Sequence, residues 1–253
     1  FFGLRHIKNV GSSDCEKIMS FLQDNNVSDY TWLDCLINLV YAQKINKRAT
    51  IALISVGAFN GKNNTENRKK MLYEFNSWKE VLTAREQKYI SENYHNHNTL
   101  YDCIEDLITN FKVTAKRREA LVDTNNSLKN PFYSLDDSIS TIAQDEEKLF
   151  GCSLTCSKTD AVENCISTVV CKDIANGMIT GREYKTKRGK TPGQLMAFIC
   201  GEDGTGMLDS ITIFPEQYAE FKDLLTEGNT VLIRGEISKK DKSSIIINKV
   251  TQA

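Results

Sequence analysis

The order of strand-like and helix-like segments over the last eighty or so residues constrains the fold of this chain more than any other feature. Five segments rich in β-branched and apolar residues are typical of strands, and they cover residues 173–184, 195–200, 208–214, 230–235 and 244–247. Between the third and the fourth, residues 215–225 have helical spacing, with Pro215 at the first turn and Gly228 beyond the end. The pattern predicts three strands, one helix and two strands, in that order.

This is the order of the OB-fold, a five-stranded β-barrel that holds an oligonucleotide between its 1–2 loop, its 4–5 loop and the face of strands 2 and 3. Both loops are basic in this chain, which favours contact with phosphates. The cations in and beside these loops are Arg182, Lys185, Lys187, Arg188, Lys190, Lys239, Lys240 and Lys242. A solvated hairpin tip is the alternative interpretation of the first loop.

The second strand carries the first candidate for base stacking. If Ala197 and Ile199 face the core, Phe198 faces outward, because side chains alternate along a strand. An aromatic ring on this face can stack on any base. Tyr184 and Phe214 are further candidates, although either ring could instead pack at an end of the barrel.

Composition limits the classes of function. The net charge is −1, so phosphate binding would depend on local clusters of cations. With 253 residues, 40% of them hydrophobic, the chain can bury one large core or two modest ones. The eight cysteines lie in apolar runs, which favours a reducing, cytoplasmic compartment. They include no CxxC pair, which argues against a zinc site. No apolar run approaches the length of a membrane span.

The amino-terminal part is helical in pattern and begins with a candidate phosphate-binding turn. Apolar residues at helical spacing flank Asn9-Val10-Gly11, which predicts two short helices around a tight turn. Such a turn lets backbone N–H groups at the start of the second helix approach a phosphate. The candidate contacts are Lys8, Asn9, Gly11, Ser12, Ser13 and Lys17. An ordinary hairpin of two helices is the alternative.

A second segment of this kind follows. Asp29 could cap a helix over residues 30–39, and residues 44–61 are typical of another helical hairpin that ends at glycine. Its candidate phosphate contacts are Lys47 and Arg48. Together the two segments predict a tandem helix-hairpin-helix.

Several of these segments resemble one family, the C-family of replicative DNA polymerases, whose members are the alpha subunits of bacterial DNA polymerase III. The matching segments are 3–11, 46–48, 53–60, 196–198, 202–206 and 214–215. Residues 146–154 are similar to the helix that precedes the OB domain in this family, although the usual His-Pro after it is absent. The resemblance covers residues 1–75 and 145–253.

The resemblance implies an α+β multidomain chain, in which a helical helix-hairpin-helix domain is followed by a five-stranded OB-fold β-barrel. The expected domains are a tandem helix-hairpin-helix DNA-binding region over residues 1–80, a helical connector or insertion over 81–165, and a nucleic-acid-binding barrel over 166–253. Residues 81–134 depart from the family. They include a basic segment with Lys112, Lys116, Arg117 and Arg118. The resemblance implies no role for this segment.

The resemblance also implies a function. The parent polypeptide, bacterial or phage-encoded, would be a DNA-directed DNA polymerase, and its catalytic domain with Mg²⁺ would lie upstream of Phe1. The present chain would hold duplex DNA by its turns and the single-stranded template by its barrel, without sequence specificity. Within it we nominate no catalytic residue, metal ligand or cofactor, and we interpret Asp136 and Asp137 as helix caps.

The expected partners are double-stranded and single-stranded DNA and, from the family, a sliding clamp and other replisome subunits, with no membrane. Residues 146–150 superficially resemble a clamp-binding peptide but match the helix before the barrel better. Two other classes of function stay open. One is a non-enzymatic adaptor that binds single-stranded nucleic acid, and the other is an RNA-binding appendage of a tRNA-handling enzyme.

Overall fold

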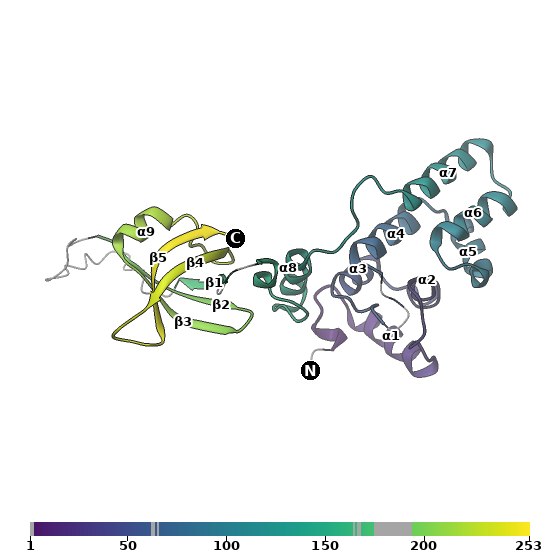
Figure 1. Ribbon diagram of the computed structural model, residues 1–253. Helices are drawn as coiled ribbons and strands as arrows, with labels where there is room; N and C mark the ends of the chain where they lie inside the picture. Colours follow the sequence, from purple (N-terminus) through teal and green to yellow (C-terminus); the bar gives the residue numbers. More distant parts are fainter. Residues whose placement is uncertain (1–2, 62–63, 65, 164, 166–167, 175–193) are drawn as a thin grey trace. The chain divides into compact units, whose positions relative to one another are not determined.

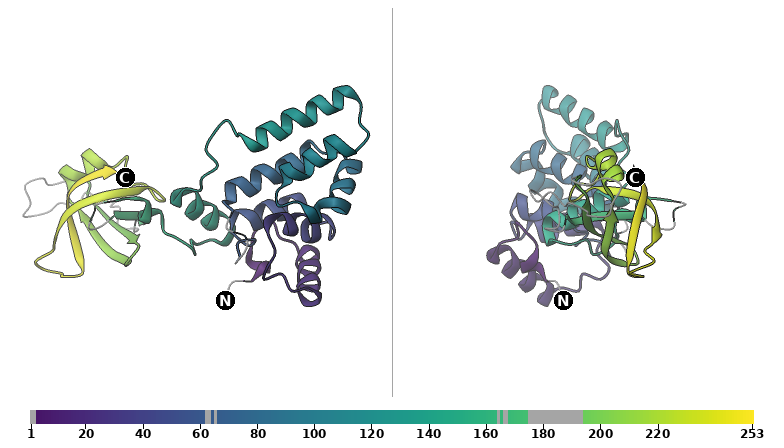
Figure 2. Two further views of the ribbon diagram at one scale, coloured as in Figure 1. Left: turned by 45° about the vertical axis from the view of Figure 1, so that its right-hand side comes forward. Right: turned by 90° about the vertical axis from the view of Figure 1, so that its left-hand side faces the viewer.

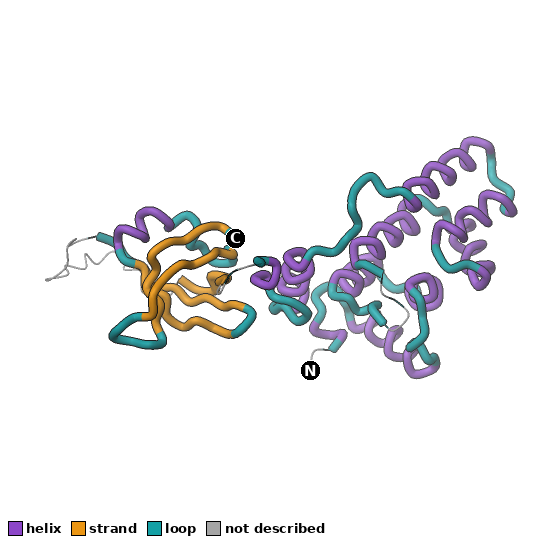
Figure 3. Tube along the Cα trace, in the orientation of Figure 1, coloured by secondary structure: helices purple, strands orange, loops and turns teal. Residues whose placement is uncertain are grey.

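The computed structural model describes residues 3–61, 64, 66–163, 165, 168–174 and 194–253 (Figure 1). The chain divides into two compact units, Phe1–Ser153 and Leu154–Ala253. The first unit is built from helices and the second contains the strands (Figure 3). An α+β chain with a helical part followed by an OB-like barrel is thereby confirmed, whereas the domain boundaries near residues 80 and 165 stay predictions.

The helical unit consists of short and medium-length helices. They are η1 (Leu4–His6), α1 (Ser12–Asp24), α2 (Trp32–Asp34), η2 (Cys35–Tyr41), α3 (Lys47–Ser55), α4 (Arg68–Glu80), α5 (Ala84–Asn93), η3 (Tyr94–Asn96), α6 (Leu100–Asn110), α7 (Ala115–Lys129) and α8 (Ile139–Phe150). Before α5, α6, α7 and α8 a threonine or serine hydroxyl accepts a hydrogen bond from an N–H of the first turn. Neighbouring helices pack in pairs, α3 on α4, α5 on α6 and α6 on α7 (Figure 2).

The helix after residue 30 differs from the expectation that Asp29 caps it. Thr31 takes that place, because its hydroxyl accepts from the Asp34 N–H at 3.2 Å while the Asp34 carboxylate accepts from the Thr31 N–H at 2.9 Å. This reciprocal pair satisfies two N–H groups of the first turn at once. After α2 the backbone widens into η2, a π-helix.

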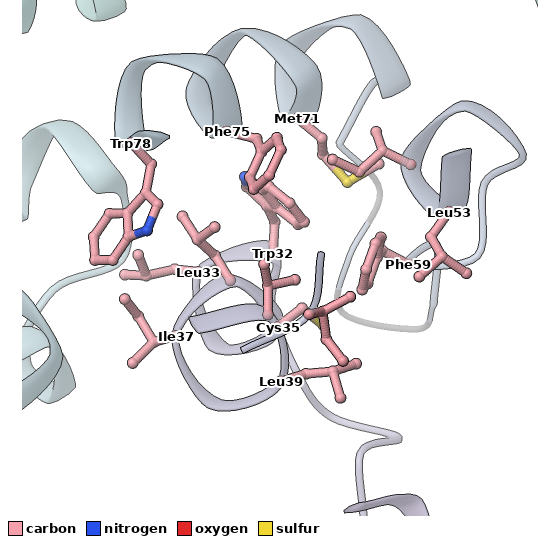
Figure 4. Close-up of a cluster of buried hydrophobic side chains, with 14 of the residues drawn as sticks. Trp32, Leu33, Cys35, Ile37, Leu39, Leu53, Phe59, Met71, Phe75 and Trp78 are labelled. Carbon is pink, nitrogen blue, oxygen red and sulfur yellow. The ribbon is translucent and has the colours of Figure 1, made fainter. Parts of the chain in front are cut away.

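The core of the helical unit forms around α4. Its Met71, Phe75 and Trp78 are fully buried and face Trp32 and the side chains of η2 (Figure 4). Trp32 meets Phe59 edge-on, with ring centroids 5.5 Å apart. Large aromatic rings contribute much of the apolar area that a domain of this size buries, so this cluster holds α2, η2 and α4 together.

The segment before α8 caps α4 from a distance. The Asp137 carboxylate accepts hydrogen bonds from the backbone N–H groups of Arg68 and Lys69 at 2.8 and 3.0 Å. Asp136 accepts from the Asn67 side chain at 3.4 Å. The interpretation of this acidic pair as a helix cap is confirmed for Asp137, which caps α4 rather than the nearby α8.

The second unit is a closed barrel with the strand order β1-β2-β3-β5-β4. Its elements are η4 (Lys158–Ala161), β1 (Thr168–Ile174), β2 (Ala197–Asp203), β3 (Gly206–Ile213), α9 (Pro215–Phe221), β4 (Thr230–Ile237) and β5 (Ser244–Gln252). Strands β3 and β5 pair in parallel, and the other neighbours are antiparallel. This arrangement is the one predicted from the order of the segments.

The first strand begins earlier than the sequence pattern predicts. Strand β1 starts at Thr168, where Val169 and Cys171 are buried in the barrel core, rather than at Asp173. The predicted continuation of this strand to Tyr184, and the loop after it, lie outside the described residues. Phe221 and Leu225, from α9 and the turn after it, complete the core.

Candidate nucleic-acid interface

The first candidate turn joins η1 to α1 and has the backbone shape that the sequence predicts. Asn9 adopts a left-handed conformation with φ 75°, and Val10 behind it is buried. Gly11 is the N-cap of α1, and Gly11, Ser12 and Ser13 are exposed. The first N–H groups of any helix lack intrahelical acceptors, so this exposed end can donate to an anion.

The second candidate turn, before α3, repeats the first residue by residue. Lys44 is left-handed with φ 52°, Ile45 is buried, and Asn46 is the exposed N-cap of α3. The Asn46 side chain accepts from the Arg48 N–H at 2.7 Å. Sequence reasoning missed Lys44. The signal was present in the order of a polar residue, a β-branched residue and an N-cap, which both turns share.

The two turns contact each other directly. Asp14 in the first turn of α1 accepts a hydrogen bond from the Asn46 N–H at 3.2 Å, and Lys17 donates to the carbonyl of Lys44 at 3.1 Å. Asp14 is buried, so its carboxylate faces the neighbouring turn and not the solvent. The amino-terminal ends of α1 and α3 are therefore held side by side, as two candidate anion sites at a fixed spacing.

The predicted cations around these turns differ in availability. Lys47 forms an ion pair with Glu80 at 2.8 Å, and Lys17 is engaged by the Lys44 carbonyl. Lys8 and Arg48 are exposed, and the backbone N–H of Lys8 donates to the Leu149 carbonyl at 2.9 Å. Lys8 and Arg48 are thus the predicted cations with the freest side chains, and their contact with DNA stays a prediction.

On the barrel, Phe198 lies on the outer side of β2. Its side chain is 37% exposed, whereas its neighbours Ala197 and Ile199 are at most 1% exposed. In the register of the sheet, Phe198 is opposite Thr212 of β3. Phe214 is also exposed, directly after β3 and at the N-cap of α9. The two rings are the aromatic side chains that the structure places where the sequence predicts stacking.

A row of hydroxyl groups on β3 and β5 was not predicted. Ser244 of β5 lies 3.2 Å from the hydroxyls of both Ser210 and Thr212 of β3. Because Thr212 is the register partner of Phe198, this row adjoins the stacking candidate. Single serine and threonine residues in strands carry no signal that distinguishes such a row from scattered hydroxyls facing water.

The 4–5 loop is shaped by its own side chains. Ser238 accepts from the N–H groups of Lys240 and Asp241 at 3.3 Å, and Asp241 accepts from the N–H and hydroxyl of Ser243. These bonds to Ser243 hold the pKa of the Asp241 carboxyl below its usual range. The predicted cations of this loop are exposed, namely Lys239, Lys240 and Lys242. The other loop candidates lie outside the described residues, namely Arg182, Tyr184, Lys185, Lys187, Arg188 and Lys190.

The described residues contain no group of three or more His, Cys, Asp or Glu side chains that could hold a metal ion. No helix in the described part of the chain is long and apolar enough to cross a membrane. The two turns, the 4–5 loop and the outer side of β2 offer hydrogen-bond donation, positive charge and aromatic stacking. These are the contacts that bind a nucleic-acid backbone and unpaired bases.

Comparison with known proteins points to one group of relatives. No protein-family model matches the chain. The DNA polymerase III subunit alpha of Streptococcus pyogenes is 28% identical over 185 residues, which cover 66% of this chain and 18% of the relative. The same subunit from a serotype M18 strain is 32% identical over 120 residues, 47% of this chain and 11% of the relative. That of Borreliella burgdorferi is 25% identical over 265 residues, 98% of this chain and 21% of the relative.

The homology to DNA polymerase III alpha subunits is thus weak to moderate, at 25–32% identity. In the Borreliella comparison it extends over nearly the whole chain. The chain spans about a fifth or less of the length of these relatives.

Proposed function

We propose that this chain is the DNA-holding part of a replicative DNA polymerase of the DNA polymerase III alpha type. It holds duplex through two helix-hairpin-helix turns and single-stranded template through the barrel, without sequence specificity. The observation that carries the proposal is the pairing of the two turns through Asp14 and Asn46, in a chain with homology to these polymerases.

The duplex is held by its phosphates. The exposed amino-terminal ends of α1 and α3 each present backbone N–H groups and the positive end of a helix dipole. Because the two ends are fixed side by side, they can contact two phosphates at once. Phosphates are regularly spaced along a duplex, so the same pair of contacts can form at every step. Such contacts position a protein on DNA and read no sequence.

The single strand is held by the barrel. Phe198 and Phe214 offer aromatic faces for bases, and the cations of the 4–5 loop attract the backbone. The predicted cations of the 1–2 loop, Lys185, Lys187, Arg188 and Lys190, add to this charge. The barrel binds any base, since every base has a π-face that can stack.

The polymerase activity belongs to the parent protein in this proposal, together with Mg²⁺, a cytoplasmic location and association with a sliding clamp and other replisome subunits. The clamp contact is not assigned to residues 146–150. Glu146 and Leu149 are buried in the helical unit, so this segment cannot insert into a partner without leaving its own core.

The test is DNA binding by the whole chain, measured by fluorescence anisotropy over a range of salt concentrations. If about four to six phosphates are engaged, the affinity for duplex falls with salt with a log–log slope of roughly −3 to −5. Ser13→Glu is the variant that best separates an effect on DNA binding from an effect on stability. A carboxylate in the first turn of α1 stabilises the helix through its dipole but repels a phosphate.

The variant should therefore bind duplex more weakly while it melts at the same or a higher temperature, and its affinity for single strands should change less. A duplex affinity that does not depend on salt contradicts the proposal. A preference for RNA over DNA in both strand forms would favour the tRNA-handling alternative.

A further inference from the structure

Several helix ends of the first unit meet at the carboxyl-terminal end of α4. Lys47 in the first turn of α3 pairs with Glu80 at 2.8 Å. Arg117 in the first turn of α7 donates to the carbonyl of Val81, the next residue, at 2.7 Å. The starts of α3 and α7 therefore lie beside the same end of α4.

Helix α5 begins at the same place. Arg117 also donates to Glu86 in the first turn of α5, with its Nε 2.7 Å from Oε1. The carbonyl of Trp78 near the end of α4 accepts from the Gln87 side chain at 2.8 Å. The carboxylates of Glu80 and Glu86 and the carbonyls of Trp78 and Val81 are thus already engaged by side chains of the protein.

Cationic side chains outnumber acidic side chains at this end of α4. Lys79 is half-buried and directly precedes Glu80, the partner of Lys47, and burial, then the charge of the Lys47 ammonium, lower its pKa. Arg48, Arg85, Lys116 and Arg118 are exposed, and the described residues provide no carboxylate partner for them. Glu119 is an exposed acid beside Arg118. We name Lys79, Arg85, Lys116 and Arg118 the α4-end surface, and assign Arg48 to the second turn.

The charge of this surface favours a polyanion as its occupant. Like charges that gather without counter-charges destabilise a fold slightly, and a bound array of phosphates removes that cost. The α4-end surface adjoins the second candidate turn, because Lys47 links α3 to Glu80, and that turn is linked to the first through Asp14 and Asn46. Contacts thus link the first turn to the second and the second turn to the end of α4.

We propose that the α4-end surface contacts backbone phosphates of the same duplex beyond those held at the two turns. This inference rests on the proposed function and extends it to residues 81–134, for which the sequence supplied no role. The α4-end surface lengthens the footprint of the protein on duplex DNA and adds no base recognition.

The experiment uses the whole chain and duplexes of about 10 and about 30 base pairs, roughly one and three helical turns. The double variant Lys116→Gln/Arg118→Gln removes two exposed charges. On the longer duplex we expect a salt slope smaller by about 1–2 and an affinity lower by about tenfold at low salt, since each lost phosphate contact reduces the slope by about 0.9. On the shorter duplex, which the two turns occupy, the loss should be smaller.

Lys129→Gln is the matched control. Lys129 lies on the same helix, 13 residues after Lys116 and so about 20 Å away, and pairs with Glu105. It should bind both duplexes like the wild type. Arg85→Gln on α5 is a second, independent variant, and thermal melting verifies that each variant is folded.

The outcomes separate this inference from the proposed function. If Ser13→Glu weakens duplex binding while the double variant and Arg85→Gln leave the affinity and slope unchanged, only the α4-end surface is overturned. An equal loss in Lys129→Gln also overturns it, because the effect would then be one of total charge. If the wild type shows no salt-dependent duplex binding, both proposals fall.

Discussion

The Arg68 guanidinium donates a hydrogen bond to the Glu146 carboxylate at 3.0 Å, with the two side chains only 10% and 1% exposed. Arg68 also donates to the carbonyl of Ser55 at the end of α3, at 2.9 Å. Gly57, which is left-handed with φ 74°, leaves the space for this arginine, since a Cβ atom there would lie 2.7 Å from it. One buried ion pair thus joins α8 to α3 and α4.

Replacing Glu146 with alanine should destabilise the helical unit strongly. The change leaves a buried guanidinium without this carboxylate, and breaking a buried pair costs about 3–5 kcal/mol. Chemical denaturation measures the loss. Glu80→Ala is the matched control, because it breaks the exposed pair with Lys47 and should cost about 0–1 kcal/mol. Equal losses in the two variants would show that burial of the Arg68 pair contributes nothing.

The stability of the helical unit should depend on pH through Glu74 of α4. Burial raises the pKa of this carboxyl to about 7, with the charge of Glu66 acting in the same direction and the Lys70 ammonium opposing it. A carboxyl with a raised pKa in the folded state contributes stability at acidic pH that is lost as the pH rises through its folded value.

Between about pH 4.5 and pH 7 this contribution should decline, by an amount on the order of 3 kcal/mol. Glu74→Gln should flatten this part of the profile and be more stable than the wild type at pH 8. Denaturant titrations at pH 5 and pH 8 provide the comparison, and a wild type that gains stability over this range relative to the variant would contradict the assignment.

Phe198 and Ile199 are adjacent on β2 and should respond oppositely to truncation. Phe198→Ala should weaken single-strand binding by about 1–3 kcal/mol, the usual value of a stacked base, with a small change in melting temperature. Ile199→Ala should instead cost about 2–5 kcal/mol of stability, because its side chain is buried in the barrel core. Anisotropy and thermal melting of both variants decide. Unchanged binding by a stable Phe198→Ala variant would rule out the stacking role.

Lys44 should tolerate glycine but not valine. Its φ of 52° lies in the left-handed region, where a Cβ atom costs roughly 1–2 kcal/mol and glycine nothing. Lys44→Gly should therefore be as stable as the wild type or more so. Lys44→Val should lose stability by at least about 1 kcal/mol, since a β-branched residue fits this region worst. A Lys44→Val variant as stable as Lys44→Gly would indicate that the turn differs in solution.

The order of the barrel elements and the local shape of the turns could be predicted from the amino-acid sequence. Each of the confirmed local features depends on only a few neighbouring residues, so it can be predicted without knowledge of the fold. They are the proline at the start of α9, the alternation around Phe198 and the Asn9-Val10-Gly11 turn. The barrel followed from the order of its strands. The start of β1 could not be predicted from that order. The apolar residues before Asp173 also fit a loop or a helix, and only their pairing with β2 and β4 identifies them as part of a strand.

Which charged groups are available to a ligand depends on how the helices pack. Lys47 and Arg117 look like free cations in the sequence, yet the fold pairs them with Glu80 and Glu86. Asp137 caps α4 from 69 positions away along the chain. Such pairings depend on which helix ends are brought together by packing. A local sequence pattern does not specify contacts between residues so far apart in the chain. The sequence therefore predicts a surface rich in cations, and packing selects those that stay exposed to a ligand.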